Sequence, residues 1–246
     1  MTSEKATFLP DNNPEFKMAL QRDLINKAGM YVEEYMNKFD GSHDFSHIRR
    51  VLGTAHQIYS QITKTSVENS SNNARQPLDL EVITLCAVLH DVGDRKYLKE
   101  GENQKTLVQD LLLGFGADIE LAMKVQTICL AVSYSEEKKD PAYVQDLIAK
   151  YPELAVVQDA DRLDAIGAVG IGRVFTYGGA KTTRGMEGSI EMTEIKLFEL
   201  EGMMKTGPGR EIARERTERL RIFRGWWDEE AETGSLGSKV LASAES

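Results

Sequence analysis

The residues best suited to chemistry are His90 and Asp91, which end an apolar run. From Leu80 to Leu89 nearly every residue except Glu81 is apolar or small, a pattern that predicts a helix buried on all sides. An imidazole and a carboxylate are costly to bury unless something pairs with them, and a divalent cation suits both groups together. The pair is therefore a candidate for metal binding, and a simple buried hydrogen-bonded pair is the alternative.

Few other residues can complete such a site. His47 lies in an early helical segment that spans residues 44–61, and Asp161 lies in a late cluster of carboxylates at residues 158–164. One early histidine, a central His-Asp pair and a late aspartate thus all fall on predicted helices. The chain has only four histidines, at positions 43, 47, 56 and 90.

This order resembles the H…HD…D pattern of the HD-domain superfamily of metal-dependent phosphohydrolases. The resemblance covers roughly residues 15 to 230 and is closest to a subgroup of small, stand-alone HD hydrolases. It implies an all-α fold, an HD-domain helical bundle with a single domain. Four stretches carry it: residues 47–51 (HIRRV), 89–97 (LHDVGDRKY), 158–167 (QDADRLDAIG) and 173–179 (RVFTYGG).

The resemblance also implies a ligand set for one divalent metal ion. Two imidazoles and two carboxylates would neutralise the ion and leave about two of roughly six positions for water and substrate. Relatives with two metals supply further histidines between the central pair and the last aspartate, and this chain has none there. Manganese, iron, cobalt, nickel, zinc and magnesium all remain open. The implied ligands are His47, His90, Asp91 and Asp161.

The activity implied is that of a metal-dependent, phosphodiesterase-like phosphohydrolase that acts on a small phosphorylated molecule, such as a nucleotide. Asp91 would act through the metal, and Asp94 would accept a proton from the attacking water or orient it. A carboxylate that merely supports the helix end is the alternative for Asp94. Basic residues and a tyrosine beside the ligand blocks are the candidate phosphate contacts: Arg50, Lys96, Arg162, Arg173 and Tyr177. Asp164 could instead pair structurally with one of these arginines.

Two other functions remain open. An HD-type iron oxygenase would need a two-iron bridge, which the histidine count disfavours. A non-catalytic nucleotide-binding HD protein would keep the site for binding alone. The arginines between residues 210 and 224 alternate with glutamates, so a solvated helix face is the default for them.

The composition limits the classes of partner that the protein is expected to bind. The chain has 246 residues, 41% of them hydrophobic, and 30 basic against 39 acidic residues give a net charge of −9. This charge argues against nucleic-acid or membrane binding by the whole surface, so the expected partner is a small phosphorylated substrate, with a homodimer left open. Cys86 and Cys129 lie in apolar stretches and are expected to be free core thiols, which favours a cytoplasmic protein.

Helical patterns fill most of the chain, which favours one domain. We expect a flexible arm at residues 1–13, an HD domain with a C-terminal helical extension at 14–231 and a disordered tail at 232–246. Residues 63–77 are expected to form a surface loop, and residues 136–140 a charged turn. Seven glycines between residues 167 and 188 predict a loop with backbone close to a ligand.

Overall fold

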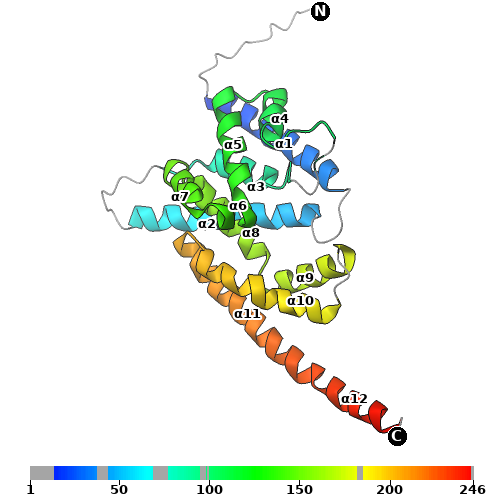
Figure 1. Ribbon diagram of the computed structural model, residues 1–246. Coiled ribbons are helices and arrows are strands. Elements are labelled where there is room, and N and C mark those ends of the chain that lie inside the picture. The colour runs from blue at the N-terminus through cyan, green and yellow to red at the C-terminus, as the bar shows by residue number, and fades with distance from the viewer. Residues whose placement is uncertain are drawn as a thin grey trace, which may run out of the picture. The chain divides into compact units, whose positions relative to one another are not determined.

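The computed structural model describes residues 14–37, 44–68, 77–94, 98, 100–181 and 185–244 (Figure 1). The predicted arm, His43 and Lys96 lie outside these ranges. Every regular element within them is helical, which confirms the predicted all-α class. None of these helices is long and apolar enough to cross a membrane.

The chain divides into two compact units. The first unit comprises residues 1–38 and 75–154, and the second comprises residues 39–74 and 155–246. Length and hydrophobic content limit how much core a chain can bury, but they do not say how that core is divided.

The first unit is organised around the apolar helix that ends at His90. This helix, α3 (Leu80–Leu89), is buried from Val82 onward, as predicted, and packs against α1 and α5. The Asp79 carboxylate caps it by accepting hydrogen bonds from the N–H groups of Glu81 (2.9 Å) and Val82 (3.3 Å). The other helices of the unit are α1 (Pro14–Met36), α4 (Leu107–Phe115), α5 (Ile119–Val132), α6 (Tyr134–Lys139) and α7 (Pro141–Lys150).

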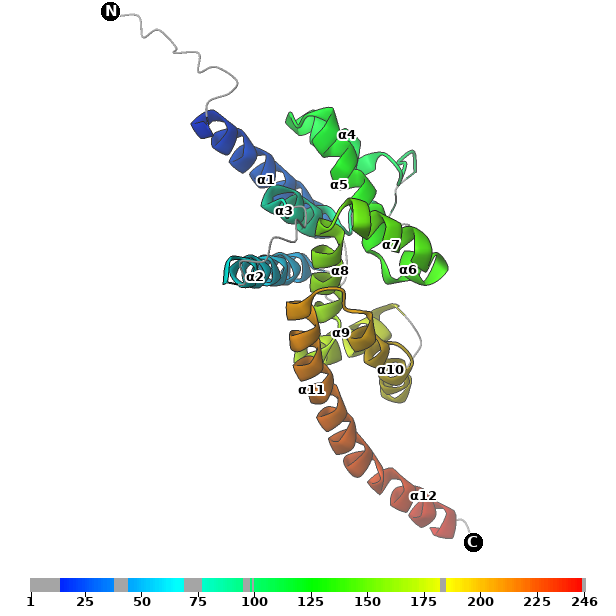
Figure 2. The same cartoon turned by 90° about the vertical axis from the view of Figure 1, so that its left-hand side faces the viewer.

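The second unit carries α8 (Glu153–Asp164) from Ala155 onward and packs α11 against α9, η2 and α2. Within this unit α11 runs on into α12 (Figure 2). The elements are α2 (Phe45–Glu68), α9 (Gly167–Lys181), α10 (Met186–Met192), the π-helical turn η1 (Thr193–Leu197), the 3₁₀ segment η2 (Phe198–Met203), α11 (Gly207–Ala231) and α12 (Thr233–Ala244).

A buried carboxylate fixes the start of α11. Asp159 accepts hydrogen bonds from the backbone N–H groups of Lys205 (2.8 Å) and Thr206 (2.7 Å) and from the Thr206 hydroxyl (2.7 Å). The same hydroxyl accepts from the N–H of Gly209 at 2.9 Å and so caps α11. A Cβ at Gly209 would clash with the Asp159 carboxylate, so glycine is what allows this close approach.

Within the glycine-rich segment, residues 167–181 and 186–188 are helical, so the predicted loop is wrong there. Gly167 takes a left-handed φ of 74° at the junction of α8 and α9, and two of the following glycines, Gly170 and Gly178, allow close packing. A Cβ at Gly170 would clash with the backbone carbonyl of Ala165, and one at Gly178 with the Ser189 hydroxyl. Sequence patterns cannot separate glycines that permit a turn from glycines that permit close helix contacts.

Three further segments are more helical than predicted. Helix α2 continues to Glu68, into the segment expected to be a loop, and the expected charged turn forms α6. Residues 233–244 form α12 rather than a disordered tail, although no residue of this helix is buried. A helix also forms from hydrogen bonds within its own segment, without burial against the rest of the protein.

Replacing Gly170 by alanine should destabilise the protein by about 1–3 kcal/mol, because a backbone carbonyl cannot move aside as a flexible side chain would. Gly172 is the matched control: it lies on the same helix, and a Cβ there meets nothing within 4 Å. Gly172→Ala should stabilise the helix by about 0.5–1 kcal/mol. Urea denaturation of both variants measures the free energies of unfolding, and equal values for the two would contradict the packing role.

Candidate functional site

His47 and Asp161, the first and last predicted ligands, lie together in the second unit. His47 is in the first turn of α2 and is 1% exposed, and its Nε2 is 3.5 Å from Oδ1 of Asp161 on α8. Its Nδ1 is 2.8 Å from Oδ2 of Asp164. Because an ionised carboxylate only accepts hydrogen bonds, Nδ1 of the neutral imidazole carries the proton and Nε2 is the basic nitrogen.

Asp164 holds this arrangement together. Its carboxylate is 3% exposed and also accepts hydrogen bonds from Arg50, through Nε at 2.7 Å and Nη2 at 3.0 Å, and from Arg173 Nη1 at 3.0 Å. Burial alone would raise the pKa of the Asp164 carboxyl, but the hydrogen bonds from His47 and Arg50 and the charge of Arg173 hold it well below its usual range. Asp164 is therefore a permanent anion at neutral pH.

His90 and Asp91 lie at the end of α3 in the first unit. Nδ1 of His90 is 2.9 Å from the carbonyl oxygen of Ala87, so it donates to that carbonyl and leaves Nε2 as the basic nitrogen. This Nε2 is 3.5 Å from Oδ1 of Asp91. The two His-Asp pairs thus share one local geometry, although they come from different parts of the chain.

The turn after this pair depends on Gly93. Gly93 has a φ of 82°, which favours glycine, and its N–H donates to the hydroxyl of Tyr35 at 3.4 Å. The N–H of Asp94 donates to the carbonyl of Asp91 at 3.3 Å. Burial raises the pKa of Tyr35, and the nearby charges of Glu102, Asp94 and Asp91 add to this effect, so Tyr35 stays a neutral hydroxyl beside the turn.

The donor chemistry of both pairs fits a divalent metal ion. Two ligands that each lie about 2.1 Å from one ion are about 3.0 Å apart in octahedral and about 3.4 Å apart in tetrahedral geometry. The 3.5 Å separation within each pair is close to these values. In each pair an oxygen acceptor also orients the imidazole through Nδ1, as acceptors around metal-bound histidines do.

The residues that were predicted to contact substrate differ in their partners and in their burial. Arg50 and Arg173 contact Asp164, a partnership that the sequence left open, and Tyr177 lies half-buried on α9 four residues after Arg173. Arg162 is only 2% exposed, and its Nη1 faces the carbonyl of Met203 at 3.5 Å. Because a guanidinium buried against the backbone offers little surface to a substrate, this placement does not favour Arg162 as a phosphate contact, which stays a prediction. Asp94 is half-buried.

Sequence reasoning missed two contributors. Asp164 was considered only as a partner of arginine, and its three-residue spacing from Asp161 was the signal that places both carboxylates on one face of α8. The second is Tyr35. No local pattern connects it with Gly93, because 58 residues separate them.

Fold and site residues together define an all-α protein with a histidine, a His-Asp pair and an aspartate in fixed order. The HD domain family matches residues 44–166, and the chain belongs to this family. The uncharacterized protein YpgQ of Bacillus subtilis is 33% identical over 193 residues, which cover 76% of this chain and 83% of YpgQ.

Solved structures agree with this assignment. The crystal structure of B. subtilis YpgQ in complex with ADP matches with a TM-score of 0.62 at 29% identity and covers 86% of this chain and 96% of that one. An HD-superfamily hydrolase from Bacillus thuringiensis matches with a TM-score of 0.59 at 27% identity and covers 86% of this chain and 98% of that one.

Asp164→Asn should lower the free energy of unfolding of the metal-free protein by about 3 kcal/mol at pH 7, because His47 and two arginines lose their anionic partner. The folded pKa of Asp164 lies below the unfolded value of about 3.9. The wild-type advantage is therefore fully present above that value and is lost as the pH falls toward the folded pKa. Urea denaturation at pH 7 and pH 3 tests this, with the exposed Asp146→Asn as control; an advantage that is unchanged at pH 3 would contradict it.

Proposed function

We propose that this chain is a metal-dependent phosphohydrolase that acts on a small phosphorylated molecule. The observation that carries the proposal is the repeated His-Asp geometry, with 3.5 Å between Nε2 and Oδ1 in each pair. HD domains bind divalent metal ions, and the family match includes both pairs in the expected order. His47, His90 and Asp91 are candidate ligands, two of them buried and one half-buried. We assign one ion to His47, His90, Asp91 and Asp161.

Each group has a defined task in hydrolysis. A bound divalent ion lowers the pKa of a water and offsets negative charge on phosphoryl oxygens. His47 and His90 present Nε2 because Asp164 and the Ala87 carbonyl hold their Nδ1 protons. Asp94, held near Asp91 by the turn at Gly93, accepts the proton that the attacking water loses.

Arginines beside His47 are suited to the phosphate. Arg50 uses Nε and Nη2 on Asp164, which leaves the Nη1 donors of this guanidinium for a substrate oxygen. Arg173 contacts the same carboxylate, so the two cations sit next to the partner of His47. Because Asp164 already holds both guanidinium groups in place, substrate binding loses little side-chain entropy. Lys96 and Tyr177 remain proposed contacts.

A nucleotide is the substrate class that we favour. The relative YpgQ has been crystallised in complex with ADP, and a nucleotide carries the phosphate groups that Arg50 and Arg173 would bind. Phosphate release should be assayed across nucleoside mono-, di- and triphosphates with manganese, iron, cobalt, nickel, zinc and magnesium. Binding without release under every metal would instead support a nucleotide-binding protein. An oxygen-dependent product with two irons per chain would support the oxygenase.

Replacing Asp91 by alanine should remove both the metal and turnover, because this carboxylate supplies one of four ligands. Elemental analysis of the purified variant should find less than about a tenth of the wild-type metal, and phosphate release should fall at least about a hundredfold. Asp110 on α4 is an exposed carboxylate, and Asp110→Ala should change neither value. An Asp91→Ala protein with full metal content and full activity would refute the ligand assignment.

Replacing Asp94 by asparagine should lower kcat by about a hundredfold while metal content and KM stay near wild type, because the amide cannot accept a proton. If Asp94 merely supports the helix end, kcat will fall less than about tenfold.

A further inference from the structure

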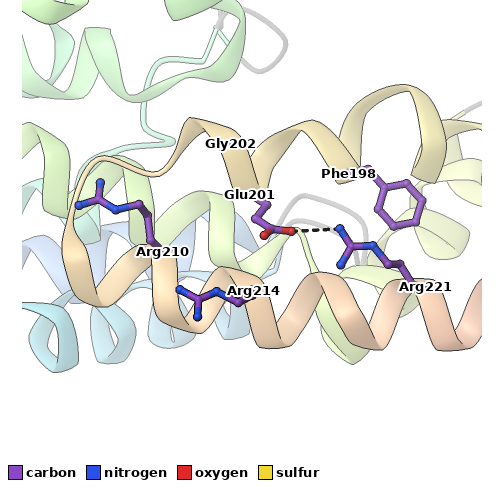
Figure 3. A pocket seen from close by; sticks show the side chains of 6 residues that line it. All are labelled: Phe198, Glu201, Gly202, Arg210, Arg214 and Arg221. Carbon is purple, nitrogen blue, oxygen red and sulfur yellow. Dashed lines mark hydrogen bonds and ion pairs between the residues drawn. The ribbon is translucent and has the colours of Figure 1, made fainter.

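Three arginines of α11 line a pocket of about 390 Å³ in the second unit (Figure 3). Arg210, Arg214 and Arg221 are spaced by four and seven residues, so they project within about 40° of one another around the helix axis at about 100° per residue. The facing wall is the 3₁₀ segment η2, which contributes Phe198, Glu201 and Gly202. We call this feature the arginine pocket.

The arginine pocket is positively charged on an acidic protein. Three arginines against one glutamate give a local charge of +2, whereas the whole chain carries −9. A concave site with the opposite sign from the rest of the surface concentrates anions. All three arginines are exposed, as expected for a solvated helix face, and the concave wall formed by η2 is what the sequence did not predict.

The three guanidinium groups differ in how many contacts they make with the protein. Arg221 lies 3.3 Å from Glu201 and 3.3 Å from Glu218, and it stacks over the ring of Phe198 at 5.9 Å. Arg210 uses Nη1 on the carbonyls of Met204 (3.3 Å) and Lys205 (3.0 Å). These contacts hold both side chains at the pocket without consuming all five donors of either guanidinium.

Arg214 stands between them and is exposed. Among the described residues it makes no hydrogen bond or ion pair. A guanidinium that lies between two anchored ones, with its planar set of donors available, matches the oxygens of a phosphate group. Glu201 and Glu218 compete only for Arg221, so the end of the pocket at Arg210 and Arg214 is the more positive one.

We propose that the arginine pocket binds the phosphate groups of a small phosphorylated molecule. None of the four assigned metal ligands lines it, so the proposal does not depend on metal binding or on hydrolysis. On the opposite face of α11, Arg216 donates to the carbonyl of Leu163 at 2.6 Å.

Calorimetric titration with inorganic pyrophosphate tests the proposal. The full-length Asp91→Ala chain serves as background, so that the proposed metal centre does not contribute to binding, and the wild-type chain is titrated in parallel. Arg214→Ala should weaken pyrophosphate binding about tenfold, and Arg210→Ala with Arg214→Ala should abolish it. Higher salt should also weaken binding.

Arg219 supplies the matched control. It is exposed on the same helix, pairs with Glu215 at 3.6 Å and does not line the pocket, so Arg219→Ala should change the affinity less than twofold. Inorganic phosphate and ADP distinguish the sources of the phosphate group: tighter binding of ADP than of pyrophosphate assigns the pocket to a nucleotide. Absence of pyrophosphate binding, or equal affinities of the Arg214→Ala and Arg219→Ala variants, would overturn the proposal.

Discussion

The second unit depends on the burial of one negative charge. A carboxylate removed from water destabilises the fold unless charged or polar donors replace its hydration. Asp164 meets this requirement with His47, Arg50 and Arg173, which come from two different helices. Since the loss of any of these donors would leave the buried charge less well compensated, the carboxylate helps to fix how α2 and α9 meet the end of α8.

The same carboxylate links structure to chemistry. Because Asp164 occupies Nδ1 of His47, this histidine presents Nε2 toward Asp161. In the first unit the carbonyl of Ala87 performs this task for His90. The partners differ in charge: an anion behind an imidazole supports a cation at its other nitrogen more strongly than a neutral carbonyl does. The two pairs are thus alike in geometry and unequal in electrostatics.

Although the chain is acidic overall, some of its arginines form positively charged clusters. One cluster, Arg50 and Arg173, is held by the buried Asp164, and the other is the row of arginines on α11. The first is defined by a buried anion and the second by the regular spacing of one helix face. Helix α11 can present this row because its other face is occupied by Ala213, Thr217 and Leu220, which are buried.

The sequence by itself determined the helical class, the family and the types and order of the candidate ligands. The apolar run from Leu80 to Leu89 also placed α3, since this signal is local. Tertiary structure alone decided which partner each polar group takes: Asp164 for His47, Tyr35 for Gly93 and Met203 for Arg162. It also showed that Gly170 and Gly178 allow close approaches, of the Ala165 carbonyl and of the Ser189 hydroxyl. Such pairings join residues far apart in the chain, so no short stretch of sequence encodes them, whereas helix formation and residue chemistry are local properties.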